Sequence, residues 1–380
     1  MRNLKVENFG PIKKAEISFG DLTVIVGQQA SGKSLLLQLF KLICDAGDIR
    51  KNLHSHGFEG AALEYGMELF FGEGMSKLNS PNTRISVGVK EYWIDDLLTS
   101  RSRASESVFY VPAQRVITIQ DGWPRNFNNY NAGDPYVVKD FSENLRQLME
   151  QGLGRGEAPI FPQDGKLKGF LRDRIDKSIF HGAKITLEKG GLKKRFMLNI
   201  SGSSLPYMTW SAGQREFMPL LLGLYWLIPS SAKPKRDGIK YVVIEEPEMG
   251  LHPSAIKSLL LLFFELVARG YKVIVSTHSP VILEGIWALQ TLKKLKAGPE
   301  SIFKLFDIPP HRNQKGLLDS YSVLLEKKTA CYLFERGNSG AEVKDISSLD
   351  PFSEDDAISE WGGITSFSTK VNDLISSLIK

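Results

Sequence analysis

The chain is poor in cysteine and lacks a long apolar run. Cys44 and Cys331 are the only cysteines among 380 residues, so the sequence indicates neither a disulfide scaffold nor a zinc module. The longest uncharged run, residues 217–232, contains two prolines and a glycine and is too short to span a bilayer. The charged N-terminus also lacks the apolar segment of a signal peptide. We therefore expect a cytoplasmic protein with no membrane partner.

Charge and composition leave several classes open. The net charge of +5 is a mild basic excess, which is compatible with nucleic-acid binding but does not indicate it. With 42% hydrophobic residues the chain can bury a sizeable core, enough for one large or two ordinary domains. The sequence has no internal repeat, heptad run or low-complexity tract.

Residues 22–34 combine a short β-branched apolar run with the pattern G-x-x-x-x-G-K-S, and helical spacing of apolar residues follows. Strand, glycine-rich loop and helix form a P-loop, whose backbone N–H groups point at phosphate oxygens. Lys33 can reach the β- and γ-phosphates, and the Ser34 hydroxyl can bind Mg²⁺. The residues expected to bind ATP are Gly27, Gln28, Gln29, Ala30, Ser31, Gly32, Lys33 and Ser34.

Two later strands end in polar residues. The apolar stretch 241–244 is followed by Glu245 and Glu246, and the next strand, 272–276, is followed closely by His278. Because parallel strands present their carboxyl ends at one edge of a sheet, these side chains should lie beside the P-loop. We expect Glu245 to hold Mg²⁺, Glu246 to polarise the attacking water, and His278 to contact the γ-phosphate. An acidic surface turn and a structural histidine are the simpler alternatives.

A third motif opens a long apolar helix, predicted over residues 211–228. Ser211 has the residue type of an N-cap, and the N–H groups of the first turn could bind an anion. The motif reads Ser211, Ala212, Gly213 and Gln214. Taken alone it describes an ordinary capped helix.

Together and in this order, the motifs resemble those of ABC-type ATPase heads of the SMC/RecF/OLD group, AAA-family ATPases of the kind found in bacterial anti-phage systems. The resemblance implies that Gln114 is the Q-loop glutamine and a further metal ligand, and that residues 211–214 are the signature motif. In such heads the signature motif of one protomer completes the ATP site of the other. Departures from the usual pattern stand at Gln29, Ala30, Trp210, Ala212, Glu245 and His252.

The resemblance implies an α/β fold of the P-loop NTPase type, with a mixed sheet. We expect the head over residues 1–298, with a compact helical and hairpin lobe inserted at about 121–208. Residues 299–380 are expected to form an α+β extension that packs on the head or docks a partner. Within it we expect strands at 302–306, 321–326 and 330–334, then a terminal helix. The insertion is too short for an SMC coiled coil, and the absence of Asp-x-Asp argues against a TOPRIM nuclease.

Basic residues gather in the stretch 166–195. A solvated basic face and a contact with nucleic-acid phosphates are both compatible with this pattern. The residues that would make such a contact are Lys166, Lys168, Arg172, Arg174, Lys193, Lys194 and Arg195.

The sequence therefore predicts an ATPase that uses ATP and Mg²⁺. We expect a homodimer, or a higher homo-oligomer, that closes head to head on ATP and controls a separate effector protein or a nucleic-acid transaction, as in anti-phage defence. One alternative is a RecF-like DNA-repair clamp. A second alternative is an ATP-gated scaffold with negligible hydrolysis.

Overall fold

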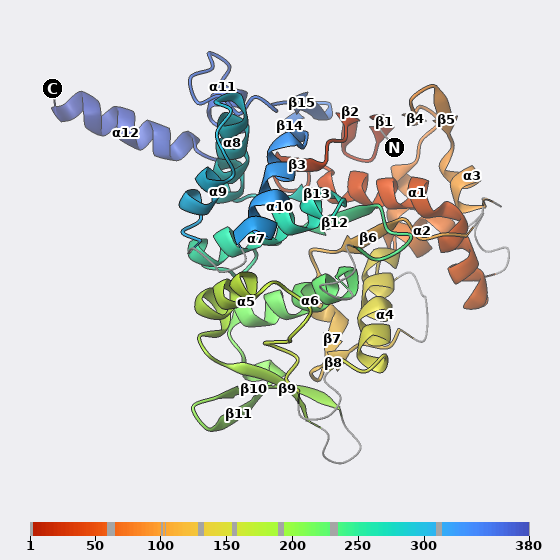
Figure 1. Cartoon of the computed structure of the whole chain (residues 1–380). Helices are drawn as coiled ribbons and strands as arrows, with labels where there is room; N and C mark the ends of the chain where they lie inside the picture. The colour runs from red at the N-terminus through yellow and green to blue at the C-terminus, as the bar shows by residue number, and fades with distance from the viewer. Residues whose placement is uncertain are drawn as a thin grey trace.

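A ten-stranded mixed sheet organises the chain (Figure 1). The computed structural model describes residues 3–58, 65–99, 102, 104–127, 133–153, 158–188, 194–228, 235–308 and 314–379. In sheet order the strands are β5 (Lys90–Tyr92), β4 (Arg84–Val87), β1 (Asn3–Phe9), β2 (Ile12–Ser18), β15 (Gly340–Asp345), β14 (Thr329–Gly337), β3 (Leu22–Gly27), β13 (Lys272–Ser276), β12 (Tyr241–Glu245) and β6 (Val108–Val111). The five strands from β14 to β6 are mutually parallel, and β5 to β1 pair antiparallel with one another.

The parallel strands are buried on both faces because their side chains alternate between two apolar clusters. In β3, Val24 and Val26 belong to one cluster, and Ile25 belongs to the other. β12 divides in the same way, with Val242 and Ile244 opposite Val243. Strands buried on both faces appear in the sequence as continuous apolar runs, and this pattern predicted β3 and β12.

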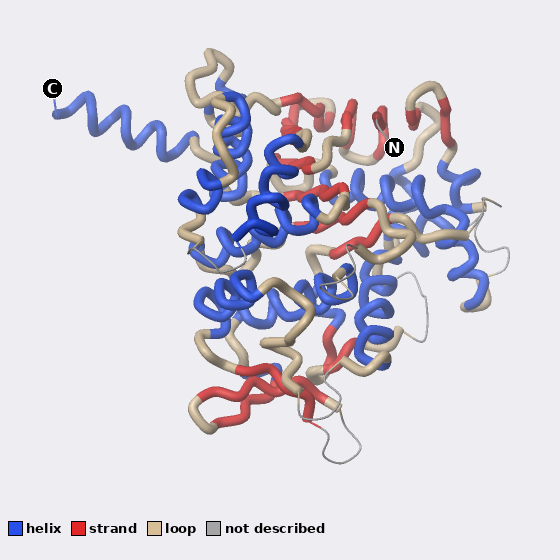
Figure 2. The backbone as a smooth tube through the Cα atoms, in the orientation of Figure 1, coloured by secondary structure: helices blue, strands red, loops and turns tan. Residues whose placement is uncertain are grey.

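Helices cover both faces of the sheet (Figure 2). One cluster contains residues of α1 (Lys33–Ser55), α2 (Gly66–Phe71) and α3 (Ile94–Leu98). The larger cluster contains residues of α4 (Tyr136–Glu150), α5 (Gly169–Ile175), α6 (Ala212–Leu227), α7 (Pro253–Ala268), α8 (Pro280–Lys294), α9 (Glu300–Leu305) and α10 (Gln314–Glu326). Short helical turns are η1 (Met75–Leu78), η2 (Arg115–Thr118), the π-turn η3 (Asp176–Phe180) and η4 (Tyr207–Thr209).

The lobe predicted at about 121–208 contains α4, α5 and a three-stranded sheet that lies below the main sheet in Figure 1. The expected hairpin is β9 (Lys184–Glu188) and β10 (Arg195–Ile200), and a third strand, β11 (Ser203–Pro206), extends it. At the start of this lobe the short strand β8 (Trp123–Pro124) pairs with β7 (Ile119–Gln120).

The expected strands at 302–306 and 321–326 are wrong, because these segments lie in α9 and α10. The buried residues explain the error. Ile302, Phe303 and Phe306 recur at helical spacing, as do Tyr321, Leu324 and Leu325. Short apolar runs of this kind do not distinguish a strand from a buried helix. The expected strand at 330–334 is confirmed as part of β14, which lies in the main sheet beside β3. The boundary at residue 299 stays a prediction.

The chain ends in α11 (Asp356–Ser359) and α12 (Ser366–Ile379), and α12 projects away from the body (Figure 1). Across the described ranges, no helix is both long enough and apolar enough to cross a bilayer.

Candidate functional site

The loop after β3 has the backbone that a P-loop requires. Gly27 and Gly32 have φ values of 142° and 97°, which side chains of L-residues rarely allow. A Cβ on Gly27 would lie 2.5 Å from the carbonyl oxygen of Phe334, and one on Gly32 would lie 2.6 Å from Cγ1 of Ile12. Both positions therefore need glycine for conformation and for space.

Helix α1 begins directly after this loop, so its N-terminal N–H groups and its dipole point toward the loop. Lys33 is buried, and its Nζ donates to the carbonyls of Gly27 and Gln28, each at 2.7 Å. Burial lowers the pKa of Lys33, and the nearby carboxylates of Glu246 and Glu245 act against this shift. The ammonium group therefore lies against the loop carbonyls and within electrostatic range of the two carboxylates.

Glu245 ends β12 and is 1% exposed. The backbone N–H of Ala113 donates to its Oε2 over 3.2 Å. Burial raises the pKa of Glu245, whereas hydrogen bonds from the Ser34 hydroxyl and the Ala113 N–H lower it. A hydroxyl beside a buried carboxylate is an oxygen donor set that suits Mg²⁺. The residues present thus fit a Mg²⁺–nucleotide group, which Ser34 and Glu245 would hold. Metal binding by these two residues stays a prediction.

Glu246 adopts a left-handed backbone, with φ of 42°. Its N–H donates to the carbonyl of Ser276 over 2.9 Å, and its Oε1 lies 3.7 Å from Nε2 of His278. The two side chains are about one third exposed, at 32% and 37%, so water can reach them. The structure therefore brings together the two residues predicted to be catalytic.

Glu248 is a residue of this site that the sequence interpretation missed. Its Oε1 accepts hydrogen bonds from the Thr277 hydroxyl (2.7 Å) and from the backbone N–H of His278 (2.6 Å). Glu248 therefore fixes the loop that carries the histidine. The available signal was its position two residues after Glu246, in the run Glu-Glu-Pro-Glu at 245–248.

Gln114 follows β6, the neighbour of β12, and its side chain is exposed. The preceding residue, Ala113, makes the hydrogen bond to Glu245. This position is compatible with the predicted Q-loop role, and metal binding by Gln114 stays a prediction.

The residues predicted to be the signature motif, 211–214, form the N-cap and first turn of α6. The Ser211 hydroxyl accepts from the N–H of Gln214 (3.3 Å), and the Gln214 side chain accepts from the N–H of Ser211 (3.2 Å), which makes a capping box. Ser211 and Ala212 are exposed, so the N-terminus of α6 faces solvent. Gly213 lies against the turn after β12, where its Cβ would be 2.6 Å from the carbonyl oxygen of Gly250. Action of this motif in trans stays a prediction.

The family model described as "AAA domain, putative AbiEii toxin, Type IV TA system" matches residues 22–284, a span that includes the P-loop, the predicted signature motif, both carboxylates and His278. The chain belongs to this family. The prediction of an AAA-family ATPase head is thereby confirmed, as is the α/β class with a P-loop and a mixed sheet. No protein with a curated description matches the chain.

A comparison with solved structures finds several that are similar to the chain. An SMC head bound to the C-winged helix domain of ScpA is 11% identical, with 90% of this chain and 96% of that chain covered and a TM-score of 0.47. An SMC head from Thermotoga maritima is 14% identical, with 91% and 99% covered and a TM-score of 0.36. The dimeric bacterial ABC transporter cassette MJ0796 is 12% identical, with 74% and 90% covered and a TM-score of 0.34.

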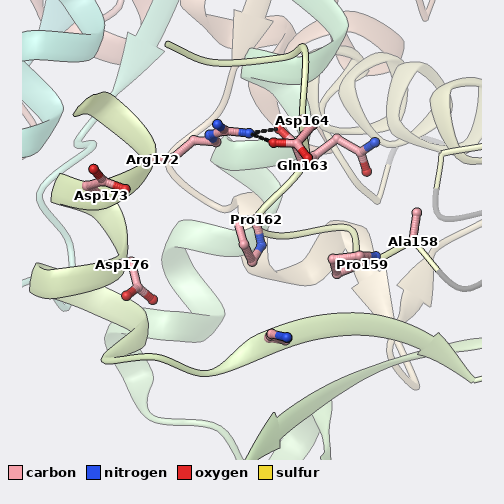
Figure 3. A pocket seen from close by; sticks show the side chains of 9 residues that line it. Ala158, Pro159, Pro162, Gln163, Asp164, Arg172, Asp173 and Asp176 are labelled. Carbon is pink, nitrogen blue, oxygen red and sulfur yellow. Dashed lines mark hydrogen bonds and ion pairs between the residues drawn. The ribbon is translucent and has the colours of Figure 1, made fainter. Parts of the chain in front are cut away.

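In this AAA-family chain, most of the basic residues predicted to contact nucleic acid have partners within the protein. Arg172 binds the carboxylate of Asp164 and the carbonyl of Gln163, as Figure 3 shows. Arg174 donates to the carbonyls of Phe306 and Asp307. The same holds for Lys168 with Glu265 and for Arg195 with Glu188.

Among the residues that the structure describes, the remaining basic candidates do not form one surface with these four. Lys194 is exposed, with its ammonium 5.7 Å from the centre of the Trp123 ring. Lys166 is half-buried, and burial lowers its pKa. Lys193 lies outside the described residues. Nucleic-acid contact by this stretch therefore stays a prediction.

Proposed function

We propose that the protein is an ATP-hydrolysing subunit that closes head to head as a homodimer on ATP and thereby controls a separate effector in a defence system. The observation that carries the proposal is the arrangement at the carboxyl edge of β3, β12 and β13. There the buried Lys33, the Ser34–Glu245 pair and the Glu246–His278 pair lie beside one glycine-rich loop.

Each group has a chemical role in hydrolysis. Lys33 and the loop N–H groups would bind the phosphates, and Ser34 with Glu245 would hold Mg²⁺, which when bound neutralises phosphate charge. Glu246 would accept the proton of the attacking water as that water bonds to the γ-phosphorus and the bond to ADP breaks. His278, held by Glu248 through its backbone, would donate a hydrogen bond to the γ-phosphate.

Dimer closure is supported by the exposed N-terminus of α6. A capped helix start with outward N–H groups is an anion site, and in this chain it is solvent-facing. A second copy could offer it to the γ-phosphate, so that hydrolysis would release the dimer. The family description names a toxin of a type IV toxin–antitoxin system, which supports a role exerted through a separate cellular partner.

The test uses Glu246→Gln, Ser211→Arg and the double variant, with Lys33→Ala as the binding control. Glu246→Gln keeps the shape and hydrogen-bonding reach of the side chain but cannot take a proton, so we expect about 10²- to 10⁴-fold slower hydrolysis. Closed dimers should accumulate in light scattering with ATP and Mg²⁺.

Ser211→Arg should block the dimer while leaving ATP binding nearly unchanged, and the double variant should remain open. Lys33→Ala should bind no ATP, because the loop N–H groups alone cannot balance the triphosphate charge. Normal hydrolysis by Glu246→Gln, or normal association of Ser211→Arg, would refute the proposed mechanism.

A further inference from the structure

Arg115 is a fully buried, permanently charged residue to which the proposed chemistry gives no role. Its Nε donates to the carbonyl of Glu216 (3.0 Å), its Nη1 to the carbonyl of Glu245 (3.1 Å) and its Nη2 to the carbonyl of Glu246 (3.2 Å). Nη2 also lies 3.2 Å from Oε2 of Glu216. A buried guanidinium is costly unless its donors are paired, so these contacts hold Arg115 in one orientation.

These contacts join two parts of the site that are far apart in sequence. Glu245 and Glu246 are the carboxylates beside the P-loop, and Glu216 lies in the second turn of α6, two residues after Gln214. Arg115 holds the carbonyl of Glu246, whose backbone is left-handed and therefore strained. The planar guanidinium thus binds the catalytic end of β12 and the start of α6 at the same time.

Neighbouring contacts reinforce this connection. Two residues before Arg115, the N–H of Ala113 binds the side chain of Glu245. On the other side, Gly213 in the first turn of α6 touches the backbone carbonyl of Gly250, which follows the carboxylates. Backbone-to-backbone contacts of this kind have little freedom to slip. A displacement of the Glu245–Glu246 peptides would therefore move the start of α6.

We propose that Arg115 is a positioning residue that couples the nucleotide state of its own site to the orientation of the α6 N-terminus offered to a second copy. The inference rests on the proposed function, because it requires that α6 completes the partner's ATP site. It follows that the two ATP sites of a dimer are interdependent, because Arg115 of each copy connects its own site to the α6 that completes the other. A residue that only fills the core would support folding without linking the sites.

The test is Arg115→Lys, with Arg269→Lys as the matched control. Lysine keeps the charge but cannot bind three carbonyls and a carboxylate at once. Arg269 is also largely buried and pairs with a glutamate, Glu265, but at the C-terminal end of α7 and away from the site. The ATPase rate is measured against ATP concentration, together with ATP binding at low protein concentration and the ATP-dependent dimer dissociation constant.

For the wild type we expect a Hill coefficient approaching about 2, the limit for two coupled sites. Arg115→Lys should lower it to about 1 and weaken the ATP-dependent dimer about tenfold, with ATP affinity of the monomer within about twofold. Arg269→Lys should keep the wild-type Hill coefficient and dimer affinity, even if its melting temperature falls.

Glu216→Gln is the second variant, and it decides the matter if Arg115→Lys does not fold. It leaves the arginine and the backbone contacts in place but removes the charge partner on α6, so the Hill coefficient should fall part of the way. Wild-type cooperativity in the folded variants would overturn the coupling. A wild type that hydrolyses ATP and dimerises with a Hill coefficient of 1 would overturn the coupling alone. A wild type that does neither would overturn the proposed function as well.

Discussion

Replacing Gly213 with alanine should destabilise the protein, although glycine in a helix is usually the less stable choice. In an unobstructed helix, Gly→Ala gains about 0.5–1 kcal/mol from backbone entropy. At Gly213 the new Cβ would lie 2.6 Å from the carbonyl oxygen of Gly250 and 3.4 Å from Cδ2 of Leu251. The first of these atoms belongs to the backbone, which cannot swing aside as a flexible side chain can.

The size of the effect follows from this distance. Ordinary contact begins at 3.4 Å, so the carbonyl, or the start of α6, must shift by about 0.8 Å. Overpacking of this kind typically costs about 1–3 kcal/mol, which exceeds the helical gain. A net loss of about 1–2 kcal/mol should lower the melting temperature by a few degrees. ATP binding should persist, because the P-loop is untouched.

The assay is calorimetric melting of Gly213→Ala beside Gly169→Ala. Gly169 begins α5, and a Cβ placed there would have Nη2 of Arg172 as its nearest neighbour, at 4.0 Å, so alanine should be neutral or stabilising. If Gly213→Ala raises the melting temperature as much as the control does, the close approach of α6 to the turn after β12 is refuted.

Two further predictions concern charged residues. Burial lowers the pKa of Lys139 to about 8, against 10.5 for the free side chain. Between pH 8 and pH 10.5 the unfolded chain therefore binds more protons than the folded chain, and the free energy of unfolding should rise with pH. In Lys139→Met this rise should be absent when the free energy of unfolding is measured in urea at pH 7.5 and pH 10. The same pH dependence in the variant and the wild type would contradict the lowered pKa of Lys139. Lys194→Glu should weaken DNA binding and reduce its salt slope by about one without changing the melting temperature, if this exposed lysine contacts phosphate. Arg174→Ala should instead lower the melting temperature, because the carbonyls of Phe306 and Asp307 lose their donor.

The candidate nucleotide site could be located from the sequence because its residues are tied to local backbone geometry. Gly27 and Gly32 have conformations that favour glycine, and Glu245 ends a strand whose apolar run is visible in the sequence. The parts that escaped prediction depend on contacts between distant segments. Arg115 reads as one basic residue in a polar turn, and only the fold places it between β12 and α6.

The same distinction holds for the basic stretch and the C-terminal segments. Arg172 and Arg174 were grouped by their nearness in sequence, but one binds Asp164 and the other binds carbonyls after α9. Apolar residues in 302–306 and 321–326 fit either a strand or a buried helix, and packing in the folded chain decides between them. Pattern reasoning thus identifies local geometry and fails where a residue's role is set by its partner.

The position of β14 has a consequence for the order in which the protein can be completed. Residues 329–334 of β14 pair with the full length of β3, and Phe334 contacts the first glycine of the nucleotide loop. During synthesis, the loop residues emerge about three hundred residues before this neighbour does. Until then β3 has one open edge, which is a template for pairing with another chain. A nascent or truncated chain that carries every nucleotide-binding motif therefore still lacks one wall of the site.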